Sequence, residues 1–147
     1  MLSSALVVSQ VEVAAGREPP KASPVRVVTF SELAGFSLAS GGSEPALPLS
    51  VSEARDRPVS IRGYLLPLAV EGGRAREFLV MRDQSACCYG RPPAANEFVV
   101  ARTDGAGLPL TMDVPVTVHG TLRIDPLIVA GDYVQFYRLE GVRLISP

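Results

Sequence analysis

Residues 116–124 read VTVHGTLRI, and this run decides the fold class. Valine, leucine and isoleucine alternate with polar residues along it, and a glycine stands at position 120. Successive side chains of a strand point to opposite faces of a sheet, so this alternation predicts a strand with one buried face. We therefore expect a mainly β protein, with this strand as its clearest element and Asp125-Pro126 as its end.

Four more segments around this run carry strand signals. We predict these strands at residues 59–66, 77–81, 97–101 and 133–145. Pro67 is expected to end the first of them, because proline cannot donate to a sheet. Gly63 and Gly120 take inward positions of long strands, where a small barrel bends tightly. About five short strands spaced by turns favour a small five-stranded OB-like Greek-key barrel with one or two short helical turns.

The chain before residue 58 carries weaker signals. Residues 1–24 are predicted to be a disordered N-terminus that ends in a proline-rich linker, and residues 25–147 to be the OB-like β-barrel domain. We expect this domain to open with a strand at residues 25–30 and a short helical turn capped by Ser31. Residues 37–50, rich in serine, glycine and proline, read as a loop.

The composition bounds the class of protein. A chain of 147 residues that is 47% hydrophobic can bury the core of one domain. Its net charge of -1 does not favour nucleic-acid binding, which relies on a positive surface. No apolar stretch reaches the roughly 18–20 residues that span a bilayer, so we expect no transmembrane segment. Residues 2–16 resemble the end of a signal peptide without its basic n-region, or else an ordinary N-terminus.

The chain has two cysteines, Cys87 and Cys88, and they are adjacent. Neighbouring alpha carbons lie about 3.8 Å apart, whereas ordinary disulfides need about 4.4–6.8 Å. A bridge between the two would therefore be strained, and it would close almost no chain. Such a bond suits a rigid local turn or a redox-sensitive site better than a stabilising cross-link. The simpler alternative is that one cysteine packs as a small hydrophobe and the other lies in a loop.

A metal site is a second interpretation of the cysteines. Cys87, Cys88 and His119, with a carboxylate, would supply four ligands for zinc, and soft thiolates also suit copper. The adjacent spacing departs from the usual Cys-x-x-Cys pattern. His119 is also the sole histidine available as a base for a catalytic cysteine. Alternation places His119 on the face opposite the apolar residues, so a surface histidine without a role is the simpler interpretation.

The segment that follows the cysteines reads as a stiff loop. Two prolines, Pro92 and Pro93, restrict its backbone, and Asn96 is placed to hold a turn before the next strand. The loop is either a structural connector or a preorganised recognition loop that presents Tyr89 and Arg91. Three aromatic residues near the C-terminus form a further candidate group: Tyr133, Phe136 and Tyr137. They either form a ligand-binding face or belong to the hydrophobic core.

Several segments together resemble an uncharacterised family of bacterial proteins. They read IRGYLLPL at 61–68, EFLV at 77–80 and CCYGRPPAANEFV at 87–99, with TFSEL at 29–33 and VHGTL at 118–122. The likeness spans residues 27–145 and implies export, to the periplasm or as a lipoprotein, and association with transport or metal-homeostasis systems. In many members the loop resembles Cys-x-His before the prolines. Here those positions are Cys88, Tyr89 and Gly90, and the missing histidine weakens a metal role.

These observations favour an exported, non-enzymatic binding or accessory domain with a protein partner at the membrane or in the periplasm. Its expected binding loop consists of Cys87, Cys88, Tyr89, Arg91, Pro92, Pro93 and Asn96. The alternative is a copper, zinc or redox site centred on the two cysteines, with His119 as a third ligand. A cysteine-dependent enzyme is a more remote alternative.

Overall fold

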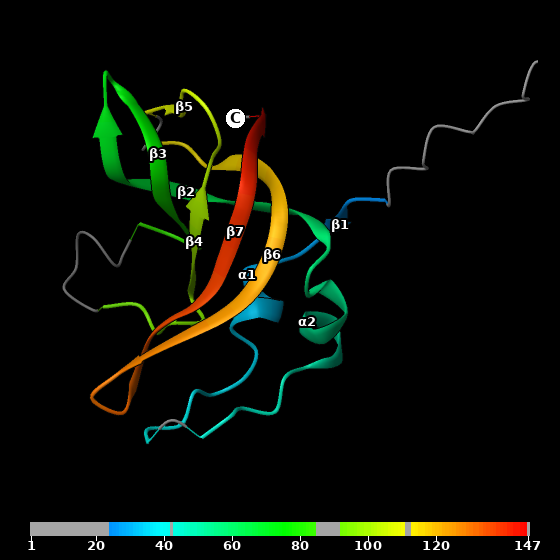
Figure 1. Ribbon diagram of the computed structural model, residues 1–147. Helices are drawn as coiled ribbons and strands as arrows, with labels where there is room; N and C mark the ends of the chain where they lie inside the picture. The colour runs from blue at the N-terminus through cyan, green and yellow to red at the C-terminus, as the bar shows by residue number, and fades with distance from the viewer. Residues whose placement is uncertain (1–23, 42, 85–91, 111–112, 147) are drawn as a thin grey trace, which may run out of the picture.

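The computed structural model of the chain describes residues 24–41, 43–84, 92–110 and 113–146. Residues 1–23, which hold the predicted signal remnant and most of the linker, lie outside these ranges. The described chain is mainly β, as the alternation predicts, with two short helices before the first long strand (Figure 1). None of its helices is long and apolar enough to cross a membrane.

Nine elements follow one another along the described residues. They are β1 (Arg26–Val27), α1 (Phe30–Leu33), α2 (Leu49–Ala54), β2 (Pro58–Glu71), β3 (Arg74–Met81), β4 (Phe98–Arg102), β5 (Leu108–Pro109), β6 (Val116–Val129) and β7 (Asp132–Ser146). Each of the five strand regions expected after residue 58 is a strand. The two-residue strands β1 and β5 stand at the two ends of the sheet order.

The strands form one seven-stranded mixed sheet in the order β1-β2-β6-β7-β4-β3-β5, with a further pairing between β2 and β3. Strand β2 has two partners in turn, because residues 58–63 pair with β6 and residues 64–71 pair with β3. Strand β4 runs parallel to β7, whereas β3 and β4, and β6 and β7, are antiparallel. The further pairing therefore joins the two ends of the series β2-β6-β7-β4-β3.

Gly63 lies where β2 changes partner. It is the last residue that pairs with β6, and Tyr64 is the first that pairs with β3. A Cβ atom at position 63 would lie 2.5 Å from the carbonyl oxygen of Met81 and 2.9 Å from a methyl group of Val80. Glycine therefore allows two strands to approach more closely than any side chain permits.

Two strands run past prolines that were expected to end them. Strand β2 continues through Pro67 to Glu71, and β6 continues through Pro126 to Val129. The ladder shifts register beside each proline, between Pro67 and Ala69 in one case and between Ile124 and Leu127 in the other. Such irregularities tolerate a residue that lacks an N–H donor, so proline does not end either strand.

The N-terminal part differs from its expected structure. The strand expected at residues 25–30 has only two residues, because Phe30 already begins α1. Thr29, and not Ser31, caps this helix: its hydroxyl accepts from the Glu32 N–H, and its own N–H donates to the Glu32 carboxylate. Helix α2 replaces the end of the loop expected at residues 37–50, and it buries Val51 and Ala54.

The core is one cluster to which both helices and the five longer strands contribute. Its largest fully buried side chains include Tyr137, Phe78, Phe136, Leu33, Ile61 and Leu122. The alternation of the opening run is confirmed, because Val116, Val118 and Leu122 are buried and His119 lies on the other face, half-buried. The hydroxyl of Tyr137 donates to the carbonyl oxygen of Leu33 at 2.7 Å, which fastens α1 to β7.

Candidate functional site

The structure describes part of the predicted binding loop. Four residues of this loop lie outside the described residues: Cys87, Cys88, Tyr89 and Arg91. Of the remaining loop residues, Pro92 is exposed, Pro93 is half-buried and Asn96 is buried. The described end of this loop leads directly into β4.

Asn96 holds the end of the loop against a segment 60 residues earlier in the chain. Its side-chain amide donates to the carbonyl oxygen of Phe36 at 2.7 Å. A turn surrounds it, in which the Glu97 N–H donates to the Ala94 carbonyl oxygen and the Ala94 N–H donates to the Glu97 carboxylate. Asn96 therefore lies in a turn before the third strand, but its side chain bonds to the distant Phe36 carbonyl oxygen and not to a group of that turn.

We expect Asn96→Ala to lower the free energy of unfolding by about 1–3 kcal/mol, because a buried donor is lost and the Phe36 carbonyl loses its partner. Urea denaturation measures the loss, and amide hydrogen exchange should quicken first at residues 94–97. Asn96→Asp is a second test variant, because it keeps the side-chain size but replaces the donor with an oxygen that faces the Phe36 carbonyl. A stability equal to the parent in both variants would contradict this role.

The loop end forms one wall of a small surface cavity. Its volume is about 150 Å³, and its lining comes from three segments far apart in the sequence: Leu38, Ala39, Ser40, Ala94, Ala95, Asp132 and Tyr133. Ligand pockets for small molecules usually measure about 300–1,000 Å³. The cavity is therefore too small for an organic cofactor, and it suits a single side chain.

An aromatic cluster adjoins the cavity through Tyr133. Phe136 contacts the rings of Phe36, Tyr133 and Tyr137 edge-on, with centroids 5.0–5.8 Å apart. The predicted aromatic group is therefore divided, since Phe136 and Tyr137 belong to the core and Tyr133 lines the cavity. The Tyr133 hydroxyl donates to the carbonyl oxygen of Ser43 at 2.8 Å, which holds the ring in place.

The β6–β7 hairpin carries a cluster of exposed apolar side chains next to this cavity. We call Leu127, Ile128, Val129 and Val134 the apolar tip; their side chains are 42–56% exposed. The hairpin turns at Ala130 and Gly131, and the Gly41 N–H donates to the Gly131 carbonyl oxygen. In Figure 1 this orange hairpin extends away from the rest of the sheet, beside the cyan segment that precedes α2.

The sequence does not reveal the apolar tip, because Asp125-Pro126 is typical of the end of a strand. The available signal was the run Leu127-Ile128-Val129 before an Ala-Gly turn, which is typical of a hairpin. Only the burial of each side chain distinguishes an exposed apolar hairpin from a core strand.

His119 lies apart from the cavity. It is half-buried on β6, opposite Ser60 on one neighbouring strand and Arg143 on the other. It lines a different cavity of about 160 Å³, together with Glu140 and Arg143 among others. The described residues contain no group of three or more histidine, cysteine, aspartate or glutamate side chains placed to hold a metal ion.

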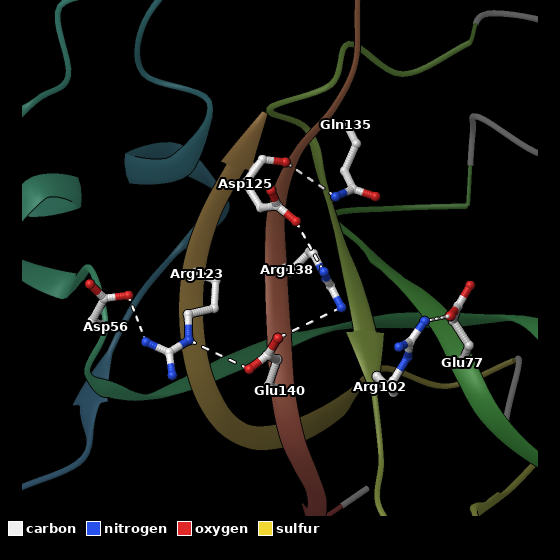
Figure 2. Close-up of polar contacts among 8 residues, drawn as sticks. All are labelled: Asp56, Glu77, Arg102, Arg123, Asp125, Gln135, Arg138 and Glu140. Carbon is white, nitrogen blue, oxygen red and sulfur yellow. Dashed lines mark hydrogen bonds and ion pairs between the residues drawn. The ribbon is translucent and has the colours of Figure 1, made fainter. Parts of the chain in front are cut away.

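The outer face of β6 and β7 carries a chain of ion pairs (Figure 2). Arg123 and Arg138 lie directly opposite each other on the two strands, an arrangement that repels. Glu140 lies within 3.6 Å of both guanidinium groups, Asp56 pairs with Arg123, and Asp125 pairs with Arg138. The carboxylates thus balance the arginines, and hydrogen bonding to Asp56 raises the pKa of Arg123.

A similar pair joins the neighbouring strands. The Arg102 guanidinium on β4 donates to the Glu77 carboxylate on β3 at 2.7 Å, and this bond raises the pKa of Arg102. Each arginine in this network of ion pairs has an acidic partner. The paired face is therefore well suited to hold the strands in register. It leaves little net charge for an ionic ligand.

Comparisons with known proteins concern the family and the fold. Residues 46–141 match the model of a family described as "Protein of unknown function (DUF3299)". The fold resembles the crystal structure of a DUF3299 family protein from Pseudomonas aeruginosa, with a TM-score of 0.58 and 21% sequence identity. The similarity covers 84% of this chain and 97% of that one. No curated protein matches the chain.

Proposed function

The chain belongs to the DUF3299 family, and from this premise we propose that it is an exported, non-enzymatic domain that binds a protein partner. The partner would be at the membrane or in the periplasm, and the domain would serve a transport or metal-homeostasis system. The resemblance of the loop and strand motifs to exported bacterial proteins supports this location.

The proposed architecture is a five-stranded OB-type barrel. The pairing of β2 with both β3 and β6 supports it, because it makes the series β2-β3-β4-β7-β6 cyclic. OB-type barrels bind ligands with loops that include the one between their last two strands. By analogy of fold, that loop corresponds here to the β6–β7 turn.

One observation carries the proposal: the apolar tip stands beside a cavity of side-chain size. Scattered apolar residues are common on protein surfaces, whereas clustered ones mark interaction sites. The tip gathers four of them within eight residues. Protein interfaces are typically centred on a few anchor side chains in fitting pockets, surrounded by apolar contacts. The cavity and the tip supply these two components.

The test compares two equally exposed valines. Val129 in the apolar tip is 56% exposed and Val70 in the β2–β3 hairpin is 53% exposed. A photo-crosslinking amino acid at position 129 should capture a partner in cells, and the same group at position 70 should not. With the identified and purified partner, Val129→Asp should weaken binding at least about tenfold, whereas Val70→Asp should change it less than about twofold.

Equal weakening by both variants, or capture at position 70 alone, would place the binding surface elsewhere. Failure to capture any protein from position 129 would also count against the proposal. Unchanged thermal unfolding of both variants serves as the control for folding.

The alternative function is a copper, zinc or redox site at Cys87 and Cys88. Thiol titration combined with intact-mass measurement, on protein prepared with and without copper or zinc, tests it. Retained metal or a reactive thiol would favour this alternative, or the remote one of a cysteine-dependent enzyme. Two free, unmetallated and unreactive thiols would exclude both.

A further inference from the structure

We propose that the cavity beside the β6–β7 turn receives a lysine or arginine side chain of the partner protein. This inference rests on the proposed function and specifies the chemistry of its partner. The partner segment would place its basic side chain in the cavity and its apolar neighbours on the apolar tip.

The charge of this end of the molecule supports a basic occupant. Three segments meet there, at residues 38–40, 94–95 and 132–133, and the described lining residues include no lysine or arginine. They include one carboxylate, that of Asp132. The balance is acidic, which favours a cationic partner.

Asp132 is the carboxylate that lines the cavity. It is exposed, and within the described part of the chain its side chain makes no hydrogen bond or ion pair. Every carboxylate on the outer face of β6 and β7 has an arginine partner, as Figure 2 shows for Asp125 and Glu140. Asp132, at the start of the same strand β7, therefore offers an unused acceptor.

The walls of the cavity suit the aliphatic part of a lysine or arginine side chain. Leu38, Ala94 and Ala95 offer apolar surface to its methylene groups, which commonly pack against hydrophobic neighbours. Tyr133 adds an aromatic ring, a group that attracts cations. A cavity of about 150 Å³ is large enough to hold a benzene-sized group, and hence the end of a lysine or arginine side chain.

A protein segment fits this surface better than a membrane does. Bilayer surfaces in bacteria carry anionic lipids, which attract basic residues and repel acidic ones. The apolar tip has Asp132 at its turn and no basic residue among the described residues beside it. A polypeptide with one basic and several apolar side chains complements both features.

The experiment follows the protein's amide signals by NMR during titration with two short peptides. One probe is acetyl-Leu-Arg-Leu-amide, and the other replaces arginine with citrulline, its uncharged analogue of nearly the same shape. We expect the arginine peptide to shift signals of residues 38–40, 94–95 and 132–133 and to bind about two- to fivefold more tightly, as an exposed ion pair implies. Asp132→Asn should remove this preference, whereas Glu71→Gln, a change of an exposed carboxylate on the β2–β3 hairpin, should preserve it.

The other outcomes separate this inference from the proposed function. Equal binding of both peptides at the cavity would overturn the basic occupant and leave the docking surface in place. A preference for arginine that survives Asp132→Asn would overturn Asp132 as the acceptor of that side chain. Signal shifts confined to other residues would contradict both. Sedimentation of the protein with phosphatidylglycerol vesicles, lost in Val129→Asp, would overturn the protein partner in favour of a membrane.

Discussion

Gly63→Ala is expected to destabilise the protein by about 2–4 kcal/mol, although it adds a single methyl group. The new Cβ atom would lie 2.5 Å from the Met81 carbonyl oxygen and 3.0 Å from the ring of Phe30. The first contact involves backbone, so no rotamer change can relieve it. Strand β2 must then shift away from β3 at the point where it changes partner, which weakens both ladders.

Gly72→Ala is the matched control for this change. Gly72 has a φ of 60° in the β2–β3 turn, and a Cβ atom there meets nothing within 4 Å. Its cost comes only from the left-handed backbone and should stay near 1–2 kcal/mol. Denaturant unfolding of both variants measures the difference. If Gly63→Ala costs no more than Gly72→Ala, β2 does not need a close approach at residue 63.

Tyr137→Ala is expected to lower the free energy of unfolding by about 3–5 kcal/mol, because a fully buried aromatic side chain leaves a cavity. The ring contacts Phe136 edge-on, and its hydroxyl donates to the Leu33 carbonyl oxygen. Burial raises the pKa of Tyr137, so the hydroxyl stays protonated and remains a donor at neutral pH.

Tyr137→Phe separates the hydrogen bond from the packing. It keeps the ring and leaves the Leu33 carbonyl oxygen without its partner, so it should cost about 1–2 kcal/mol. Hydrogen exchange should locate this smaller loss in α1, the helix that the bond fastens to β7. A Tyr137→Phe protein with the exchange pattern of the parent would show that packing alone positions α1.

The strands were predictable because their signals are local. In residues 116–124 the side chains alternate between a buried and a wetter face, and the structure buries Val116, Val118 and Leu122 accordingly. Gly63 was expected to allow a tight bend of a barrel strand, and the structure shows that a Cβ atom there would collide with Met81 and Val80. The ends of strands were less predictable, because a bulge can accommodate proline in a continuing strand, as at Pro67 and Pro126.

The candidate site was predicted in part. Asn96 was recognised as a turn residue from its position after two prolines. Its bond to Phe36 depends on a segment 60 residues away, which no local pattern predicts. Asp132 and the apolar tip were missed because each looks ordinary in sequence: an acidic residue after a turn, and an apolar run in a strand. The roles of Cys87 and Cys88 stay predictions.

Local residue patterns were enough to predict that this protein is mainly β, where its long strands lie, and which residues of β6 face the core. Alternation and turn residues carry this information because they act between neighbours in the chain. The pairing of β2 with both β3 and β6, and the surface cavity lined by residues 38–40, 94–95 and 132–133, become visible in the folded molecule alone. Those features arise from contacts between distant segments, whose partners depend on how the whole core packs.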